Sequence, residues 1–586
     1  MAILCVIGVT LLGATLFWAA WALAAPVPPP IQAERPQSEP LVPVAVRWVD
    51  ERRIAVALRE GRELAIVDVE SAAIERRIRL PFRPATLLDG GEGGWWVGGQ
   101  DGELAMIDQG GSIQWIEDLG AGPVQMARLA DGRWAAVARW ERQAAILEPR
   151  SGSRRRIALP FEPGEVIGLL DGRLVVSDAF RGQFAVLDPN ADPTRIQRLS
   201  VEGGGLRGLS LTPDGTELLY ASMVSSGTIP LTATNLDWGL VLSSKLSALR
   251  IPEDLASQGR AEPLRLTLDG SGHGAADPIA LAQSPDGRWI YIACRGSHQV
   301  IEIDRELGVP PSDGRRALGH RHRLRVVEVG RNPTALDRSP QGRLATADLM
   351  SDSITILAPR PLRLERTIRL TDVSTRRTPE LRGEALFLDA QASMDRWMSC
   401  ASCHIDGHTN GLRFDTLGDG SHGSPKDTPT LLGVGSTAPY GWTGRFATLD
   451  EQVEHSLRTT LHGPPPWPDD RADLVAYLES LAPPPRLPVT RPDLVEQGEA
   501  LFVRHLCSGC HWPPSYASRP LREVGTAAPG QSFSVPSLRG VGRTPPYLHD
   551  GSADTLEELL QRHHPECSEP LDEPQRAALA AFLESL

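Results

Sequence analysis

Leu64-Ala65-Ile66-Val67-Asp68 is a short apolar run that stops at an acidic residue. Runs of the same kind end at Asp108, Glu148 and Asp188, so successive end points lie 40 residues apart. A fixed period of about 40 residues, with several short strands in each repeat, is typical of the blades of a β-propeller. Because the small sheet of one blade cannot cover its own faces, it must pack between neighbouring blades.

The pattern continues further along the chain. Turn signals stand before apolar runs at Thr212-Pro213-Asp214-Gly215, Ser284-Pro285-Asp286-Gly287 and Ser339-Pro340-Gln341-Gly342. We therefore predict an all-β propeller of about seven blades over residues 41–372. The longer interval after Asp188 predicts an insertion of roughly 35 residues near 225–276. The turns and strands resemble those of YVTN-type β-propellers, and this likeness implies a fold rather than an activity.

The chain begins with an apolar segment that has no charged residue from Ala2 to Ala25. The segment ends in Ala22-Leu23-Ala24, which resembles the small-residue cleavage site of a signal peptide. It is also long enough to cross a bilayer as an uncleaved helix. We therefore expect a periplasmic or otherwise exported protein. Residues 1–25 are predicted to be a signal peptide or an inner-membrane anchor, and residues 26–40 a Pro-rich linker.

The composition limits the function. A length of 586 residues suits several domains rather than one. The 60 Lys and Arg residues against 73 Asp and Glu residues give a formal net charge of −13. This acidic balance gives no electrostatic reason to expect a nucleic-acid partner. The 56 Gly and 50 Pro residues favour many short strands and turns over a long helical bundle.

The C-terminal third contains the pattern Cys-x-x-Cys-His twice. The copies are Cys400-Ala401-Ser402-Cys403-His404 and Cys507-Ser508-Gly509-Cys510-His511. Two thiols at this spacing can bond to the two vinyl groups of one porphyrin, while the adjoining histidine supplies the proximal nitrogen to the iron. A zinc site would need both cysteine pairs to converge on one ion, and a redox CxxC needs no following histidine. We therefore predict two covalently attached haem c groups.

A longer internal repeat accompanies the two motifs. Pro429-Thr430-Leu431 corresponds to Pro536-Ser537-Leu538 at an offset of 107 residues, which is also the offset between Cys400 and Cys507. Two equivalent units in tandem explain this repeat. We therefore predict a mainly α cytochrome c module of two lobes, the first at 380–484 and the second at 490–586.

At these residues the chain resembles the bacterial dihaem cytochrome c peroxidase and MauG family. The resemblance rests on the two CxxCH motifs and on two further segments, Ala438-Pro439-Tyr440-Gly441-Trp442-Thr443-Gly444-Arg445-Phe446 and Pro545-Pro546-Tyr547-Leu548-His549-Asp550-Gly551-Ser552. It implies that electrons enter at the haem of the second lobe and that peroxide meets the haem of the first. It implies further that a tryptophan lies between the haems, and Trp442 occupies the matching position.

The resemblance also implies a sixth ligand for the second haem. The family uses a methionine there, but no methionine of this chain lies beyond Met398. The matching place falls on His563, with His564 and His549 as alternatives. Two imidazole ligands would give the iron a lower potential than an imidazole and a thioether would.

For the first haem, the resemblance implies that His422 is the releasable distal ligand, and His408 is the alternative. The peroxide pocket of the family contains a glutamine, matched here by Gln452. It also contains a glutamate about ten residues further on, where this chain has His462. A histidine can do acid–base work near neutral pH. We therefore predict Trp442, Gln452 and His462 as the catalytic residues.

These features together predict a dihaem c-type cytochrome that acts as a peroxidase-like oxidoreductase and reduces hydrogen peroxide or another small oxidant. Its electrons would come from a small electron-donor protein or a dehydrogenase. Two alternatives stay open from the sequence. One is a non-catalytic electron carrier that docks a dehydrogenase, and the other is MauG-like oxidation of a partner protein or an organic substrate. A calcium ion between the lobes also stays open.

Overall fold

The computed structural model describes residues 39–91, 94–148, 153–191, 194–252, 259–260, 263–270, 272–308, 324–371, 377–523, 530–562 and 570–586. They belong to one compact unit that runs from Ser38 to Leu586. The predicted leader and most of the predicted linker fall at residues 1–38, outside the described residues. Within the described ranges, no helix is long and apolar enough to cross a membrane.

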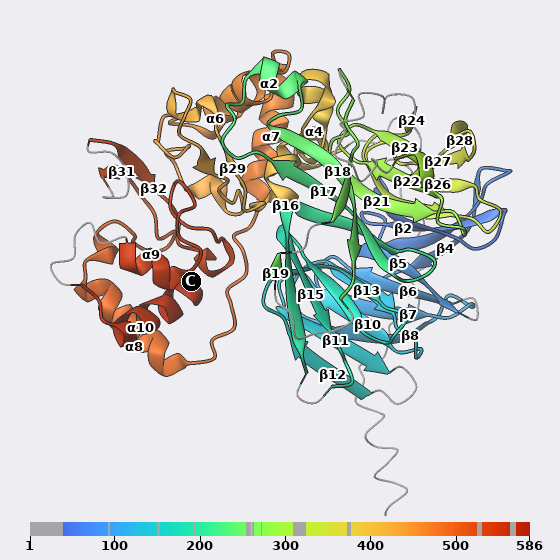
Figure 1. Cartoon of the computed structure of the whole chain (residues 1–586), viewed down its shortest axis with the longest axis horizontal. Helices are drawn as coiled ribbons and strands as arrows, with labels where there is room; N and C mark the ends of the chain where they lie inside the picture. The colour runs from blue at the N-terminus through green and yellow to red at the C-terminus, as the bar shows by residue number, and fades with distance from the viewer. Residues whose placement is uncertain are drawn as a thin grey trace, which may run out of the picture. The chain divides into compact units, whose positions relative to one another are not determined.

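Small antiparallel sheets make up the N-terminal part of the described chain (Figure 1). Blades 1 to 3 comprise β1 (Pro43–Trp48), β2 (Arg53–Leu58), β3 (Glu63–Asp68), β4 (Ala73–Arg79), β5 (Pro84–Gly91), β6 (Gly94–Gly99), β7 (Glu103–Ile107), β8 (Ile113–Asp118), β9 (Val124–Arg128), β10 (Trp134–Ala138), β11 (Gln143–Glu148) and β12 (Ser153–Ala158). The repeated apolar runs are β3, β7, β11 and the later β15, the third strand of four successive blades. These strands are mostly buried because neighbouring blades cover both of their faces.

Blades 4 and 5 share one long strand. They comprise β13 (Pro163–Gly168), β14 (Leu174–Asp178), β15 (Arg181–Leu187), β16 (Ile196–Leu211), β17 (Glu217–Ser225), β18 (Leu242–Arg250), β19 (Gly259–Arg260) and β20 (Leu264–Thr267). The first half of β16 pairs with β15, and the second half pairs with β17. The strand changes blades at Gly203-Gly204-Gly205, where Gly203 and Gly205 have positive φ angles of 104° and 63°. Glycine adopts such angles without a steric penalty.

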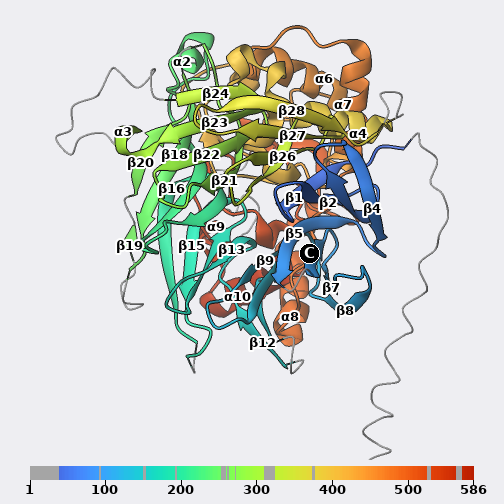
Figure 2. The same ribbon diagram turned by 90° about the vertical axis from the view of Figure 1, so that its right-hand side faces the viewer.

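The remaining blades bring the ring back to its start (Figure 2). Blades 6 and 7 comprise β21 (Pro278–Gln283), β22 (Trp289–Cys294), β23 (Gln299–Asp304), β24 (Leu324–Glu328), β25 (Pro333–Arg338), β26 (Leu344–Asp348), β27 (Ser353–Ala358) and β28 (Arg363–Arg369), with the short helix α3 (Arg305–Gly308) after β23. β1 contacts β25 and β26. Over the described residues the propeller therefore has seven blades, which confirms the predicted fold class.

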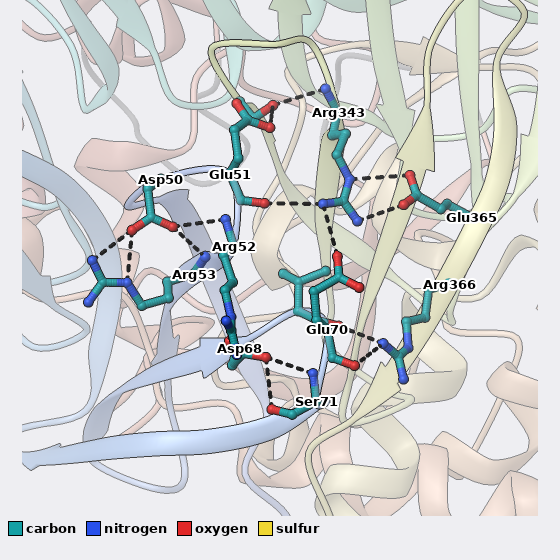
Figure 3. Close-up of polar contacts among 12 residues, drawn as sticks. Asp50, Glu51, Arg52, Arg53, Asp68, Glu70, Ser71, Arg343, Glu365 and Arg366 are labelled. Carbon is teal, nitrogen blue, oxygen red and sulfur yellow. Dashed lines mark hydrogen bonds and ion pairs between the residues drawn. The ribbon is translucent and has the colours of Figure 1, made fainter.

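Polar contacts fasten blade 7 to blade 1 (Figure 3). Arg343, just before β26, donates to the backbone carbonyl of Glu51 at 3.1 Å and pairs with Glu365 at 2.6 Å. Arg366 of β28 donates to the backbone carbonyl of Glu70 at 2.6 Å. Since these two blades do not share a sheet, side chains rather than a common strand ladder make this closure.

An inserted segment extends blade 5 between β17 and β18, within the region of the longer repeat interval. It contains the helix α2 (Ala233–Asp237), which Thr232 caps by accepting a hydrogen bond from the Asn235 amide at 3.2 Å. The Leu231 amide donates to the Asp415 carbonyl of the C-terminal region at 2.9 Å. The insertion therefore contacts the first cytochrome lobe.

The C-terminal part is mainly helical and forms two lobes, as predicted. Lobe 1 contains α4 (Pro379–Phe387), α5 (Cys400–Cys403), α6 (Leu449–His455), the π-helical turn η7 (Ser456–Thr460) and α7 (Pro468–Ser480), with β29 (Arg413–Phe414) and β30 (Lys426–Asp427). Lobe 2 contains α8 (Pro492–Arg504), α9 (Leu556–Arg562) and α10 (Glu573–Glu584), with β31 (Ser518–Glu523) and β32 (Ser532–Val535). The 3₁₀ turns are η2 (Ala390–Ala392), η3 (Met394–Arg396), η4 (Ile405–Gly407), η5 (Leu417–Asp419), η6 (Val434–Ser436), η8 (Cys507–Gly509) and η9 (Val541–Arg543).

In each lobe the first and last long helices cross at a glycine. A Cβ atom on Gly383 of α4 would lie 2.0 Å from the Asp473 carbonyl of α7. A Cβ atom on Gly498 of α8 would lie 2.1 Å from the Ala578 carbonyl of α10. Only glycine permits so close an approach, because any other residue would place its Cβ against a backbone oxygen. The two lobes therefore repeat the same helix crossing.

Candidate haem and redox site

Each CxxCH motif begins at a short helical turn. In lobe 1 this turn is α5, where Ser399 and Ser402 form a capping box. In lobe 2 the turn is η8. Residues three apart on a helical turn lie on the same face, so the paired cysteines point the same way. Each turn is formed by residues that are close together in the sequence.

The histidine of each motif is oriented by a backbone carbonyl. Nδ1 of His404 donates to the Pro429 carbonyl at 3.0 Å, and Nδ1 of His511 donates to the Tyr516 carbonyl at 2.8 Å. A carbonyl oxygen only accepts, so the proton is on Nδ1 and the lone pair is on Nε2. Burial lowers the pKa of His404 to about 4 and also lowers the pKa of His511. Both rings are therefore neutral at pH 7, as an iron ligand must be.

One continuous cavity of about 580 Å³ runs past both motifs. The rest of its wall is mainly apolar, with leucine and valine side chains from both lobes, while Arg522 and Arg539 add positive charge. Four thiols, two neutral imidazoles, an apolar wall and cations for propionate groups fit two haem c groups. The motif residues that border the cavity are Cys400, Cys403, His404, Cys507, Cys510 and His511.

Trp442 borders the same cavity, at the junction of the two lobes. Its indole Nε1 donates to the Asp427 carbonyl of lobe 1 at 2.8 Å. Its own carbonyl accepts from the Ser534 amide of lobe 2 at 2.8 Å. Both lobes therefore fix Trp442 in place. The sequence pattern does not single out Asp427, because this role uses a backbone oxygen that any residue has.

Gln452 also borders the cavity, from the helix α6. Its Nε2 donates to the Ser456 hydroxyl at 3.0 Å, one helical turn further on. Its Oε1 is buried and has no hydrogen-bond partner among the described residues. A buried polar atom without a hydrogen-bond partner is rare in proteins. Oε1 of Gln452 can therefore accept a hydrogen bond from a ligand in the cavity.

His462 lies elsewhere. The π-helical turn η7 follows α6, and His462 has a left-handed φ of 50°. Its Nε2 donates to the Leu231 carbonyl of the propeller insertion at 3.1 Å. The residues that border the cavity stop at Leu461 in this segment. The structure therefore brings Gln452 and Trp442 to the cavity but does not bring His462 there.

The predicted distal ligands of the first haem are also outside the cavity wall. His422 is exposed, and its Nδ1 lies 3.9 Å from Oδ1 of Asp415. His408 is fully buried, and both of its ring nitrogens are used. Nδ1 lies 2.8 Å from the Thr430 hydroxyl, and Nε2 donates to the Arg543 carbonyl of lobe 2 at 3.0 Å. His408 therefore joins the two lobes in this structure.

For the second haem, His563 and His564 lie outside the described residues. The third candidate, His549, borders the cavity. Its ring stacks on Phe533 with centroids 4.3 Å apart, and its buried Nδ1 has no hydrogen-bond partner among the described residues. Burial lowers the pKa of His549, which keeps the ring neutral. The position of His549 at the cavity therefore suits a contact between its ring and the haem of lobe 2.

Calcium between the lobes stays a prediction. Over the described ranges, no group of three or more His, Cys, Asp and Glu side chains is placed to hold a metal ion.

The propeller contacts both lobes through ion pairs, which are buried at Arg543 of lobe 2 but partly exposed at Asp406 of lobe 1. Asp406, two residues after His404, pairs with Arg139 and Arg207 of the propeller, the latter at 3.1 Å. These guanidinium groups hold the pKa of Asp406 far below its usual range. In lobe 2, Arg543 pairs with Glu162 of the propeller at 2.9 Å.

The fold and the site define a class of protein: a seven-bladed β-propeller followed by a two-lobed c-type cytochrome region whose cavity fits two haems. Residues 380–480 match the family described as di-haem cytochrome c peroxidase. This match confirms the resemblance seen in the sequence. Residues 380–480 are thus similar to di-haem cytochrome c peroxidases, and this similarity supports a haem-based redox role for the C-terminal region.

Two curated proteins and one solved structure are similar to parts of this chain. Methylamine utilization protein MauG of Methylophilus methylotrophus is 22% identical over 275 residues, covering 35% of this chain and 81% of that protein. Cytochrome c551 peroxidase of Nitrosomonas europaea is 22% identical over 264 residues, covering 35% of this chain and 78% of that protein. Among solved structures, Kuenenia stuttgartiensis hydrazine synthase has a TM-score of 0.47 and 18% identity, covering 56% of this chain and 98% of that chain.

Proposed function

We propose that the protein is a peroxidase-like dihaem cytochrome that takes up electrons at lobe 2 and reduces hydrogen peroxide or another small oxidant at lobe 1. When bound, the haems supply one-electron transfer and an iron at which the oxidant is reduced. The observation that carries the proposal is the continuous cavity bordered by both CxxCH motifs together with Trp442 and Gln452. The electron donor that we propose is a small redox protein or a dehydrogenase.

The side chains of the protein orient the proposed iron ligands and make part of the cavity wall polar. His404 and His511 present their Nε2 lone pairs because their Nδ1 protons are donated to backbone carbonyls. Trp442 lies between the lobes and offers an aromatic ring to the path between the two attachment sites. Gln452 offers a polar side chain to a small ligand in a mostly apolar cavity. Reducing one peroxide to two waters consumes two electrons and two protons, so each turnover draws two electrons from the donor.

The test uses the full-length holoprotein. It is reduced without oxygen, mixed with peroxide, and followed by haem absorbance. Next, peroxide consumption is measured with a reduced small cytochrome c as donor. We expect stoichiometric reoxidation followed by sustained turnover. Reoxidation without turnover, or no reaction after reductive activation, would contradict peroxidase activity and leave the haem assignment intact.

A second candidate function is a non-catalytic electron carrier that docks a dehydrogenase. The position of His462 favours this alternative, because its ring donates to Leu231 rather than facing the cavity. Carbon monoxide distinguishes the two functions. If the reduced protein binds carbon monoxide, one iron has an open position, as a peroxidase needs. If it does not, both irons are six-coordinate and the carrier is supported.

A further inference from the structure

A carboxylate of the propeller contacts the first CxxCH segment directly. Asp277 lies in the loop that leads into β21 and is only 6% exposed. Its Oδ2 accepts a hydrogen bond from the Ser399 hydroxyl at 2.6 Å, and its Oδ1 accepts one from the Ser402 hydroxyl at 2.6 Å. Ser399 precedes Cys400, and Ser402 stands between the two cysteines. Both carboxylate oxygens are therefore committed to the haem-attachment turn.

The partners of Asp277 are neutral hydroxyl groups. Over the described residues, no ion pair involves its carboxylate. Arg295 lies next to Asp277 in space, because its amide donates to the Asp277 carbonyl at 2.9 Å. Its guanidinium, however, lies 3.9 Å from Asp406 instead. The buried negative charge of Asp277 is thus stabilised by hydrogen bonds and not neutralised by a cation.

Lobe 2 lacks the groups that make this contact. At the 107-residue offset, Ser399 corresponds to Leu506 and Ser402 corresponds to Gly509. Neither residue has a side-chain hydroxyl to donate to a carboxylate. The two haem sites therefore share the CxxCH chemistry but differ in their charge environment.

We propose that Asp277 is a positioning residue that orients the first haem-attachment turn and lowers the reduction potential of the haem attached there. The propeller would thus act on the redox chemistry of lobe 1 and not only support it. This inference rests on haem being attached at Cys400 and Cys403, but it does not depend on which oxidant the protein reduces.

The physical reason is electrostatic. Reduction of ferric to ferrous iron adds one electron, so a nearby fixed negative charge disfavours the reduced form. The effect is strong in a buried site, where water screens the charge little. The carboxylate of Asp277 lies close to the attachment residues, because its two oxygens accept at 2.6 Å from Ser399, next to Cys400, and from Ser402, next to Cys403. An iron bound through His404 would lie in the same field.

The test is a spectroelectrochemical titration of the full-length holoprotein. Asp277→Asn removes the charge but keeps an oxygen that can accept a hydrogen bond. We expect the midpoint potential of the lobe 1 haem to move to a more positive value, while that of the lobe 2 haem stays the same. Asp277→Glu keeps the charge, so its lobe 1 potential should stay closer to that of the wild type. Each sample must contain two haems per chain, which separates a shift in potential from loss of haem.

Asp348→Asn is the matched control. Asp348 is also fully buried and also accepts from hydroxyl groups, those of Thr346, Ser353 and Thr355, but its partners all belong to blade 7. The Asp348→Asn variant should leave the midpoint potentials of both haems unchanged. An unchanged lobe 1 potential in Asp277→Asn, or an equal shift of both haems, would overturn the proposal.

Ser402→Ala keeps the test decisive if Asp277→Asn loses its lobe 1 haem. This variant retains the carboxylate and removes one hydroxyl dipole that partly offsets its charge. The lobe 1 potential should therefore move to a more negative value, and a more positive value would overturn the proposal. Because the measurement needs no peroxide, failure of the peroxidase proposal would not affect it.

Discussion

Gln452 and His462 are ten residues apart in the sequence but face different parts of the molecule. Gln452 borders the cavity with an unpartnered Oε1, whereas His462 donates to the propeller carbonyl of Leu231. The π-helical turn η7 lies between them and changes the direction in which the following side chains project. An acid–base role in the cavity therefore suits neither the position nor the hydrogen bond of His462.

Replacement of these two side chains separates their roles. Gln452→Leu keeps most of the volume and removes the polar group, and we expect peroxide turnover to fall by about 100-fold, as for the loss of one preorganised polar contact. His462→Gln can retain a hydrogen bond to Leu231, so its turnover should match that of the wild type. Steady-state kinetics would check both. A large loss in His462→Gln with little loss in Gln452→Leu would contradict this assignment.

Asp348 makes stability depend on pH. Burial raises its pKa to about 6, above the value of about 3.9 for an unfolded aspartate. The folded state therefore binds this proton more tightly. Its contribution to stability is complete below the unfolded pKa and is lost as the pH rises through the folded pKa.

We expect Asp348→Asn, which cannot ionise, to gain stability relative to the wild type as the pH rises from about 4 to about 7. The gain should reach about 3 kcal/mol, and the pH dependence of Tm would measure it. Asp131→Asn is the control, because a hydrogen bond from Arg133 lowers the pKa of Asp131 and the difference should run in the opposite direction. A Tm difference for Asp348→Asn that does not change with pH would contradict this account.

The propeller strands could be predicted from the sequence because each apolar run is local and repeats at a constant spacing. β3, β7, β11 and β15 fall on the four repeated runs. The sharing of β16 between two blades could not be predicted in this way, because it depends on which partner each half of one strand finds. The CxxCH turns were predictable for the same local reason, whereas the contact from Asp277 was not, since it spans 122 residues to Ser399.

The turn η9 fastens lobe 2 to blade 4. Its last residue, Arg543, is 3% exposed and pairs with Glu162, which is 2% exposed. The same guanidinium donates to the Pro485 carbonyl at 2.7 Å and lies over the Trp140 ring at 5.5 Å. Several contacts of one buried cation therefore converge where lobe 2 meets the propeller.

Arg543→Ala should weaken this junction strongly. Removal of one partner from a buried ion pair costs about 3–5 kcal/mol when the other charge is left unpaired. Because Glu162 also pairs with Arg142 at 2.7 Å, the cost of Arg543→Ala should stay below this range. The control is Arg491→Ala, which breaks an exposed pair with Asp493 and should cost less than about 1 kcal/mol. Urea unfolding followed by haem absorbance would measure both. Equal midpoints for the two variants would argue against a structural role for Arg543.

At the scale of the whole molecule, both haem-attachment turns and the propeller belong to one compact unit. Both haem-attachment turns open into the same cavity, and Trp442 is held by hydrogen bonds from both lobes. Asp277 of the propeller contacts Ser399 of lobe 1, and Arg207 of the propeller pairs with Asp406 of lobe 1. Glu162 of the propeller pairs with Arg543 of lobe 2. The sequence alone predicts the two lobes and their cofactors but not these contacts, because the residues involved lie far apart along the chain.

Trp442→Phe should slow electron transfer between the lobes. Phenylalanine keeps an aromatic ring but loses the indole N–H that donates to Asp427 and is harder to oxidise. Stopped-flow absorbance should show slower oxidation of the lobe 2 haem after peroxide is added to the reduced protein. Trp467→Phe is the control, since Trp467 is 76% exposed and does not border the cavity. Equal rates for the two variants would exclude Trp442 from the path.

The intact mass of the protein, produced in a host that matures c-type cytochromes, counts the attached haems directly. We expect a polypeptide that carries two covalently bound haems, and a Cys400→Ser/Cys403→Ser variant that carries one. A wild-type protein with a single haem, or with none, would contradict the claim that both lobes bind haem within one shared cavity.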